Sequence, residues 1–348
     1  MNSILLPDLI STCPFKPECN PAYETVSDAT EAWLNSHGIP YRELTHKYNL
    51  LSALCIPHCS QARLREACDL WTLLFFIDDI LDSTHLSKDS DGSKKHLFKN
   101  IIECLQPVGS FKPLTPFASA IHEWWQRILI NITPGCQERF ISSYQGAFEA
   151  SLLQATSRKN RQTISDLDTY IKFRRNLSYA FVAFFFIEYS LELDSLDECL
   201  TNDTFKCLVD IANDAISWAN DIYSFNNEQS QGDYNLVSVL MHADPSLNIQ
   251  QAIDRAGQMV IDRYADFERV RRELISWGTK IDTQVEKYVN GLAASIIGTI
   301  AWSFETPRYF GTEREDVKRT RRVTLLPLGA SMQENLTEGI SKQEVERN

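Results

Sequence analysis

The sequence predicts an all-α protein that folds as a single domain of roughly ten or more helices. Three observations support this prediction. Apolar residues recur at every third or fourth position along most of the chain, which is the period of a helix that buries one face. Few segments alternate between apolar and polar residues, the period of a half-buried strand. Glycine and proline number 13 each among 348 residues, too few for a chain dominated by turns or disorder.

The predicted elements follow in order along the chain. Residues 1–21 contain four prolines and are expected to form an extended N-terminal leader. Residues 22–310 are expected to form the helical domain, and residues 311–348 a polar, mobile C-terminal tail. Helices are expected at residues 22–38, 63–81, 116–130, 136–156, 164–188, 204–228, 248–276 and 284–304. Asp166 or Ser165 is expected to cap the fifth of these.

Charge and composition exclude several classes of protein. The chain has 34 Lys and Arg against 46 Asp and Glu, a formal net charge of −12. This acidic balance argues against a nucleic-acid partner, because phosphates require neutralisation by Lys and Arg. Apolar runs stay far below the ~20 residues of a membrane span, and no signal peptide is expected. The nine cysteines have no repeating spacing and are expected to be reduced thiols, which indicates a cytoplasmic protein.

The first group of candidate functional residues consists of three aspartates, Asp78, Asp79 and Asp82, directly after a nearly apolar helical stretch. On a helix Asp78 and Asp82 lie about 40° apart on one face. Like charges this close destabilise a helix unless a cation neutralises them. Hard oxygen ligands suit Mg²⁺, which binds one or two carboxylates together with substrate phosphates. The alternative reading is a helix end that runs into a polar loop.

The second group is a stripe of oxygen-bearing side chains, Asn220, Ser224 and Glu228, spaced by four residues. At this spacing they share one helix face over two turns. An amide, a hydroxyl and a carboxylate are again ligands for a hard cation. The alternative is an exposed helix face, although the preceding residues are apolar.

Together the two groups strongly resemble the class I terpene synthases. The stretch from Asp78 to Asp82 reads DDILD and is similar to the family's DDxxD motif. The stretch from Asn220 to Glu228 reads NDIYSFNNE and is similar to its NDxxSxxxE motif, which begins 142 residues later. Each motif alone is a weak pattern, but both in this order and at this distance are specific. The resemblance implies a single-domain helical bundle around a deep active-site cavity.

Further residues extend the resemblance over nearly the whole chain. Arg174 stands 46 residues before Asn220, where the family places a diphosphate-sensing arginine. The Arg308–Tyr309 pair begins 80 residues after Glu228, where the family has an Arg-Tyr pair. The proline-containing leader resembles those of fungal, particularly basidiomycete, sesquiterpene synthases.

The resemblance implies a lyase that expels diphosphate from farnesyl diphosphate and converts the carbocation to a sesquiterpene hydrocarbon or alcohol. Three Mg²⁺ ions are implied, bound by the two motifs. Asp78 and Asp79 are implied as catalytic, with Arg174, Arg308 and Tyr309 binding the diphosphate. The implied metal ligands are Asp78, Asp79, Asp82, Asn220, Ser224 and Glu228.

Two positions depart from the family pattern. Asn227 stands where the family commonly has a lysine, which removes one cation expected near the diphosphate. Leu177 replaces the usual short polar residue after the sensor arginine, whereas Ser178 is small enough for the helix break that the family has there.

The cavity has to hold a carbocation away from water, and aromatic faces attract a cation. Helical spacing from Asp78 nominates Trp71 and Phe75, and spacing from Arg174 nominates Phe181. Other candidates follow from their place beside the implied motifs: Ser178, Tyr179 and Trp302. For each aromatic residue the alternative is ordinary core packing.

Other functions stay open at this stage. A linear alcohol synthase of the linalool or nerolidol type, or a monoterpene synthase using geranyl diphosphate, shares the same motifs. A chain-elongating prenyltransferase shares the fold but normally repeats the DDxxD motif. A non-catalytic helical binding protein would carry the acidic stripes as solvated faces. The prenyl diphosphate is the expected partner, with no nucleic acid and no membrane span, and the protein is expected to be a monomer or a homodimer.

Overall fold

A computed structural model gives the structure of the chain, and it describes residues 3–83, 100–105, 113, 115–159, 166–231 and 234–327. Within these ranges the side chains of residues 77–83, 155–159 and 231 are outside the description.

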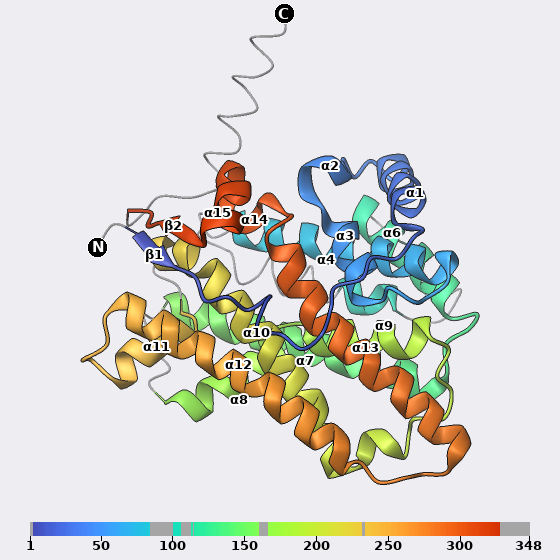
Figure 1. Ribbon diagram of the computed structural model, residues 1–348. Coiled ribbons are helices and arrows are strands. Elements are labelled where there is room, and N and C mark those ends of the chain that lie inside the picture. Colours follow the sequence, from blue (N-terminus) through green and yellow to red (C-terminus); the bar gives the residue numbers. More distant parts are fainter. Residues whose placement is uncertain are drawn as a thin grey trace, which may run out of the picture.

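Helices dominate this part of the chain, so the prediction of an all-α fold is confirmed (Figure 1). The elements in order are β1 (Ser3–Leu5), α1 (Tyr23–Ser36), α2 (Glu43–His46), α3 (Tyr48–Cys55), α4 (Gln61–Ser83), α6 (Pro116–Ile128), α7 (Pro134–Lys159), α8 (Leu167–Leu177), α9 (Ala180–Ser190), the 3₁₀ turn η2 (Cys199–Thr201), α10 (Asp203–Gln231), α11 (Leu236–Ala243), α12 (Ile249–Glu273), α13 (Thr279–Ser303), α14 (Pro307–Phe310), the 3₁₀ turn η3 (Gly311–Glu313), α15 (Arg314–Thr320) and β2 (Arg322–Thr324).

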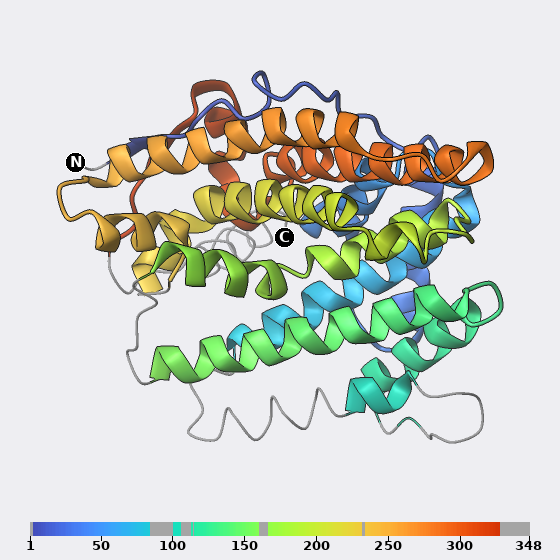
Figure 2. The same cartoon turned by 90° about the horizontal axis from the view of Figure 1, so that it is seen from below.

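Helix α10 lies at the centre of the bundle. It packs against α12 and α13 on one side and against α8, α9 and α11 on the other. Figure 2 shows α10 (yellow) between the green α8 and α9 and the orange α12 and α13, with the long helices side by side. Ile211, Ala215, Trp218 and Ile222 of α10 are spaced by three or four positions and are all buried. This buried face fixes the orientation of α10 in the bundle and with it the place of the polar residues on the same helix.

Helix starts follow local capping chemistry. Asp166 caps α8 by accepting the backbone N–H of Thr169 at 2.8 Å, as one of the two predicted caps would. The other candidate, Ser165, lies outside the described residues. Asn248 caps α12 through a reciprocal pair of hydrogen bonds with Gln251.

The single helix that periodicity predicts over residues 164–188 is wrong, because the structure divides it into α8 and α9, at the place where the family resemblance implies a helix break. The break lies at Ser178 and Tyr179, and Tyr179 has a left-handed backbone with φ of 58°. Ser178 Oγ accepts the backbone N–H of Ala180 at 3.1 Å, which supplies a partner at the start of the new helix. Helical periodicity continues through the break, so the pattern of apolar residues alone does not reveal it.

The expectation of a mobile tail from residue 311 differs from the structure over residues 311–327, which are folded. Val317 of α15 and Val323 of β2 are buried. Strand β2 pairs antiparallel with β1, and Ile4 lies opposite Val323. The paired strands bring together segments from near the two ends of the chain. Each strand has only three residues, which is too short for an alternating pattern to be recognised in the sequence. Residues 328–348 lie outside the described part.

The leader crosses the helices in an extended path after β1. Leu6 and Leu9 are buried, and the hydroxyl of Tyr264 on α12 donates to the carbonyl of Leu9 at 3.2 Å. In the described part of the chain, no helix combines the length and apolarity that a bilayer span requires.

Candidate active site

The polar stripe predicted on α10 is present as a continuous row. Asn220, Ser224 and Glu228 are all partly exposed, and Ser224 Oγ donates to the carbonyl of Asn220 at 2.8 Å. The row lies in the second half of α10, in the same turns as the buried residues Ile222 and Phe225. The apolar spacing of α10 therefore determines where the three oxygen-bearing groups lie.

Arg174 reaches this row from α8. Its Nε donates to Asp221 Oδ1 at 2.8 Å, and its Nη2 donates to Asn220 Oδ1 at the same distance. Burial lowers the pKa of Arg174, but the Asp221 carboxylate and Tyr170 outweigh that effect and raise it above its ordinary value. The guanidinium is therefore a permanent cation beside the motif.

Sequence reasoning missed the two partners that hold this ion pair. The hydroxyl of Tyr170 donates to Asp221 Oδ2 at 2.6 Å, and the backbone N–H of Leu236 donates to the same oxygen at 3.1 Å. Tyr170 stands four residues before Arg174, so helical spacing alone places it on the face of α8 that carries Arg174. Leu236 opens α11, a helix too short for its periodicity to be read.

The predicted Arg308–Tyr309 pair meets the same row from α14. Asn220 Nδ2 donates to the hydroxyl oxygen of Tyr309 at 2.7 Å. Burial raises the pKa of Tyr309, although Arg308 opposes this, so the hydroxyl keeps its proton at neutral pH. Since Asn220 occupies an acceptor position on the oxygen, the Tyr309 O–H is directed to another group.

Arg308 contacts Phe75, one of the two aromatic residues of α4 that were predicted to line the cavity. Its guanidinium carbon is 5.2 Å from the ring centroid of Phe75, and the ring of Tyr48 stacks on Phe75 at 4.2 Å. Trp71 and Trp302 contact Phe75 at centroid distances of 6.1 and 5.4 Å. Tyr48 was not among the predicted residues, since α3 is too short to show a helical face.

Trp302 sits behind this group. Its side chain is only 1% exposed, and its indole Nε1 donates to the carbonyl of Lys47 at 2.5 Å. Its ring also makes an edge contact with Tyr309 at 5.9 Å. Trp302 therefore packs against Phe75 and Tyr309 and offers almost no surface to a cavity, whereas Trp71 and Phe75 are partly exposed.

The remaining candidates lie at the break between α8 and α9. Ser178 Oγ is 2.8 Å from Asn213 Oδ1 on α10, which ties the break to the central helix. The rings of Tyr179 and Phe181 are partly exposed and form edge contacts with Tyr144 and Phe184, each at 6.3 Å. Among the described residues, Tyr179 and Phe181 therefore belong to a different aromatic group from the one around Phe75.

The three predicted aspartates are in the last part of α4, but the side chains of Asp78, Asp79 and Asp82 are outside the described residues. The placement of the first motif relative to the second therefore stays a prediction.

The chemistry of the α10 row fits a divalent cation. Burial, together with the neighbouring Asp221, raises the pKa of Glu228 to about 7, which means that its charge is poorly stabilised by the protein alone. Among the described residues, no lysine or arginine forms an ion pair with Glu228. A carboxylate, a hydroxyl and an amide oxygen on one face are hard ligands of the kind that Mg²⁺ takes. Asn220 Oδ1 accepts one hydrogen bond from Arg174 and keeps a second lone pair.

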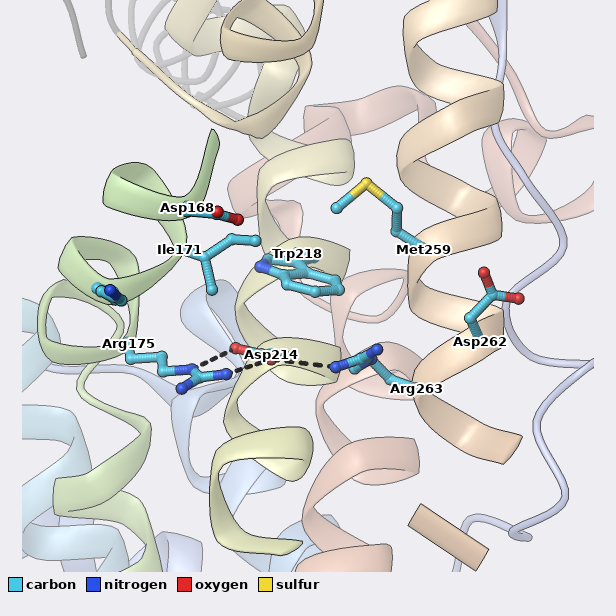
Figure 3. A pocket seen from close by; sticks show the side chains of 9 residues that line it. Asp168, Ile171, Arg175, Asp214, Trp218, Met259, Asp262 and Arg263 are labelled. Carbon is cyan, nitrogen blue, oxygen red and sulfur yellow. Dashed lines mark hydrogen bonds and ion pairs between the residues drawn. The ribbon is translucent and has the colours of Figure 1, made fainter. Parts of the chain in front are cut away.

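A separate pocket lies between α8, α10 and α12. It has a volume of about 410 Å³ and is lined by Asp168, Ile171, Lys172, Arg175, Asp214, Trp218, Met259, Asp262 and Arg263. Figure 3 shows Asp214 between two of these arginines. Arg175 binds both oxygens of Asp214, at 2.7 and 2.8 Å. The adjacent arginines of α8 thus both reach α10, but at different positions, and of the two only Arg174 contacts the α10 row.

The site residues on α8 and α10 lie within a region that matches a known family model. The family model described as "Terpene synthase family 2, C-terminal metal binding" matches residues 69–266. Sesquiterpene synthase 3 of Postia placenta is 36% identical over 92% of this chain and 88% of its own length. Alpha-muurolene synthase of Coprinopsis cinerea is 33% identical over 93% of this chain and 78% of its own length.

A solved structure of α-eudesmol synthase superimposes with a TM-score of 0.75 at 20% identity, covering 84% of this chain and 98% of that one. At this level of identity the likeness establishes the fold, a helical bundle of the class I type.

Proposed function

The chain belongs to the terpene synthase family, and from that premise we propose that it is a Mg²⁺-dependent sesquiterpene synthase acting on farnesyl diphosphate. Membership makes it an enzyme of the terpene cyclase type, acting on a prenyl diphosphate with a divalent metal. The choice of a C15 substrate is supported by the relatives, which are named sesquiterpene synthases.

The observation that carries the proposal is the meeting of three helices at Asn220. Arg174 comes from α8, Asn220 from α10 and Tyr309 from α14, and the Asn220 amide contacts the other two at 2.8 and 2.7 Å. A fixed cation and a hydroxyl donor therefore lie beside a row of hard oxygen ligands. Such a combination suits a diphosphate that arrives with Mg²⁺.

The metal ligands would be divided between the two motifs. Asp78, Asp79 and Asp82 would hold Mg²⁺ from α4, and Asn220, Ser224 and Glu228 would hold it from α10, with three ions in all. When bound, Mg²⁺ supplies Lewis-acid stabilisation of the charge that develops on the leaving diphosphate.

The protein's own groups assist the same step. The C–O bond of the allylic ester breaks heterolytically, and the diphosphate leaves with the bonding electron pair. Arg174 and Arg308 donate N–H groups to its oxygens, and Tyr309 donates its O–H. Each of these donors is held by a protein contact before substrate binds, so little reorganisation is needed as charge develops.

The carbocation left behind has to be kept from water until it loses a proton or is captured. Aromatic rings stabilise a cation by about 0.5–2 kcal/mol each. We assign Trp71, Phe75, Tyr179 and Phe181 to the wall, with Trp302 supporting Phe75 from behind and Ser178 at the helix break. Phe75 also carries the guanidinium of Arg308, which couples the wall to the diphosphate site.

The test is a product assay with purified protein and Mg²⁺, supplying farnesyl and geranyl diphosphate separately, followed by gas chromatography and mass spectrometry. The expected result is volatile C15 hydrocarbons or alcohols from farnesyl diphosphate, lost when EDTA is added. Products from geranyl diphosphate alone would refute the C15 substrate, and intact diphosphate esters in both reactions would refute the activity.

A further inference from the structure

A hydrogen bond to Glu228 comes from Asn235, the N-cap residue of α11. Asn235 is 2% exposed, and its Nδ2 donates to Glu228 Oε2 at 2.8 Å. The same nitrogen donates to the backbone carbonyl of Asp221 at 3.1 Å. One amide group thus spans two turns of the α10 row and fixes the carboxylate against the helix backbone.

The oxygen of the Asn235 amide caps helix α11. Asn235 Oδ1 accepts the backbone N–H of Ser238 at 3.1 Å, and Ser238 Oγ accepts the N–H of Asn235 at 3.0 Å. This is a capping box, and serine, threonine or aspartate performs the capping part equally well. Among these capping residues only asparagine also provides the N–H₂ group that Glu228 uses.

We propose that Asn235 is a positioning residue for the metal site, holding the Glu228 carboxylate in the orientation in which it binds Mg²⁺. The inference rests on the proposed function, since it assumes that Glu228 is a metal ligand. A glutamate side chain has three rotatable bonds, so a free carboxylate would have to be ordered each time the ion binds. The Asn235 contact orders it in advance, as outer-layer hydrogen bonds commonly do for metal ligands.

The chain provides a matched control at the start of α12. Asn248 forms the same capping box, with its Oδ1 accepting from Gln251 N at 3.0 Å, but it is exposed and belongs to a different helix start. Asn235→Ser and Asn248→Ser each retain a capping oxygen and each lose an amide N–H₂ group. Only the first change removes a hydrogen bond to Glu228.

The experiment measures thermal stabilisation of the full chain by Mg²⁺ in the presence of saturating inorganic diphosphate. For Asn235→Ser, the Mg²⁺ concentration that gives half-maximal stabilisation is expected to rise roughly 10- to 100-fold, the usual effect of removing such a contact. Asn248→Ser is expected to keep the wild-type value. Turnover of Asn235→Ser with farnesyl diphosphate is expected to recover at raised Mg²⁺, which a general loss of structure would not allow.

Equal Mg²⁺ midpoints for Asn235→Ser and wild type would overturn the inference. If Asn235→Ser fails to fold, Asn235→Asp retains both cap and size while replacing the donor with an oxygen. Its midpoint is expected to rise as well, and a wild-type or lower midpoint would overturn the inference. Wild-type protein that gains no stability from Mg²⁺ and diphosphate would instead overturn the proposed function itself.

Discussion

Replacing Asp221 with asparagine is expected to disable the site by releasing Arg174. Asp221 is 1% exposed and accepts from Arg174 Nε at 2.8 Å and from the Tyr170 hydroxyl at 2.6 Å. The substitution keeps the shape of the side chain but removes its charge, so the buried guanidinium loses its counterion. Breaking a buried ion pair in this way costs about 3–5 kcal/mol.

The size of the effect on melting temperature follows from the length of the chain. An unfolding entropy of about 2.1 cal/mol/K per residue gives about 0.7 kcal/mol/K for 348 residues. The loss of about 3–5 kcal/mol therefore lowers the melting temperature by about 4–7 K. Arg174 then loses the contact that fixes its orientation. We expect kcat/KM to fall roughly 100-fold or more, as it does when an enzyme loses a preorganised hydrogen-bond donor.

The neighbouring ion pair gives the control. Asp214 is equally buried and binds Arg175 at 2.7 and 2.8 Å, at a point on α10 six residues before Asn220. Asp214→Asn is expected to lower the melting temperature by a similar amount while leaving kcat/KM within about twofold of wild type. Both variants are assayed by differential scanning calorimetry and by diphosphate release at a temperature where each is folded. Equal losses of activity in the two variants would refute the reasoning.

Three further changes test other parts of the account. Tyr309→Phe removes the acceptor for Asn220 Nδ2 and a donor to the diphosphate. In steady-state assays kcat/KM should therefore fall roughly 10- to 100-fold, a loss of about 1–3 kcal/mol. An unchanged kcat/KM would exclude a role for the hydroxyl. Gly298→Ala places a Cβ 2.6 Å from the carbonyl oxygen of Leu54, which belongs to the fixed backbone of α3. The cost of about 1–3 kcal/mol should lower the melting temperature by about 1–4 K. An unchanged melting temperature would mean that α13 can shift away from α3. The raised pKa of Glu228 means that its protonated form favours the folded state, so the metal-free stability of the protein should fall as pH rises from 4.5 to about 7. Mg²⁺ binding should tighten over the same pH range. Glu228→Gln should abolish both trends in thermal-shift titrations, and persistence of the trends in that variant would assign them to another group.

The long helices were predictable from the sequence because each buries an apolar face of many turns. The period of α10 places Asn220, Ser224 and Glu228 in one row, and the structure has that row. The break between α8 and α9 was not located by periodicity, because the apolar residues continue through it. It depends on a left-handed Tyr179 and on contacts to Asn213, neither of which has a local pattern.

Contacts between distant segments were the least predictable part. The pairing of Ile4 with Val323 joins residues at opposite ends of the chain, and each strand is only three residues long. Asn235 lies beside Glu228 because α11 packs against α10 and Asn235 caps its start. Its capping sequence was visible, since a serine follows three residues later, but nothing local shows which helix its amide would touch.

The measurement that tests the central claim most directly is Mg²⁺-dependent release of inorganic diphosphate from farnesyl diphosphate by wild type and by Glu228→Gln. The substitution keeps size and shape, and because the raised pKa shows that the charged form is disfavoured without metal, the metal-free melting temperature should be equal or higher. The account predicts rapid release by wild type and a rate at least roughly 100-fold lower for the variant at the same Mg²⁺ concentration, as expected when a metal ligand that stabilises the transition state is lost. A folded Glu228→Gln protein that releases diphosphate at the wild-type rate would contradict it.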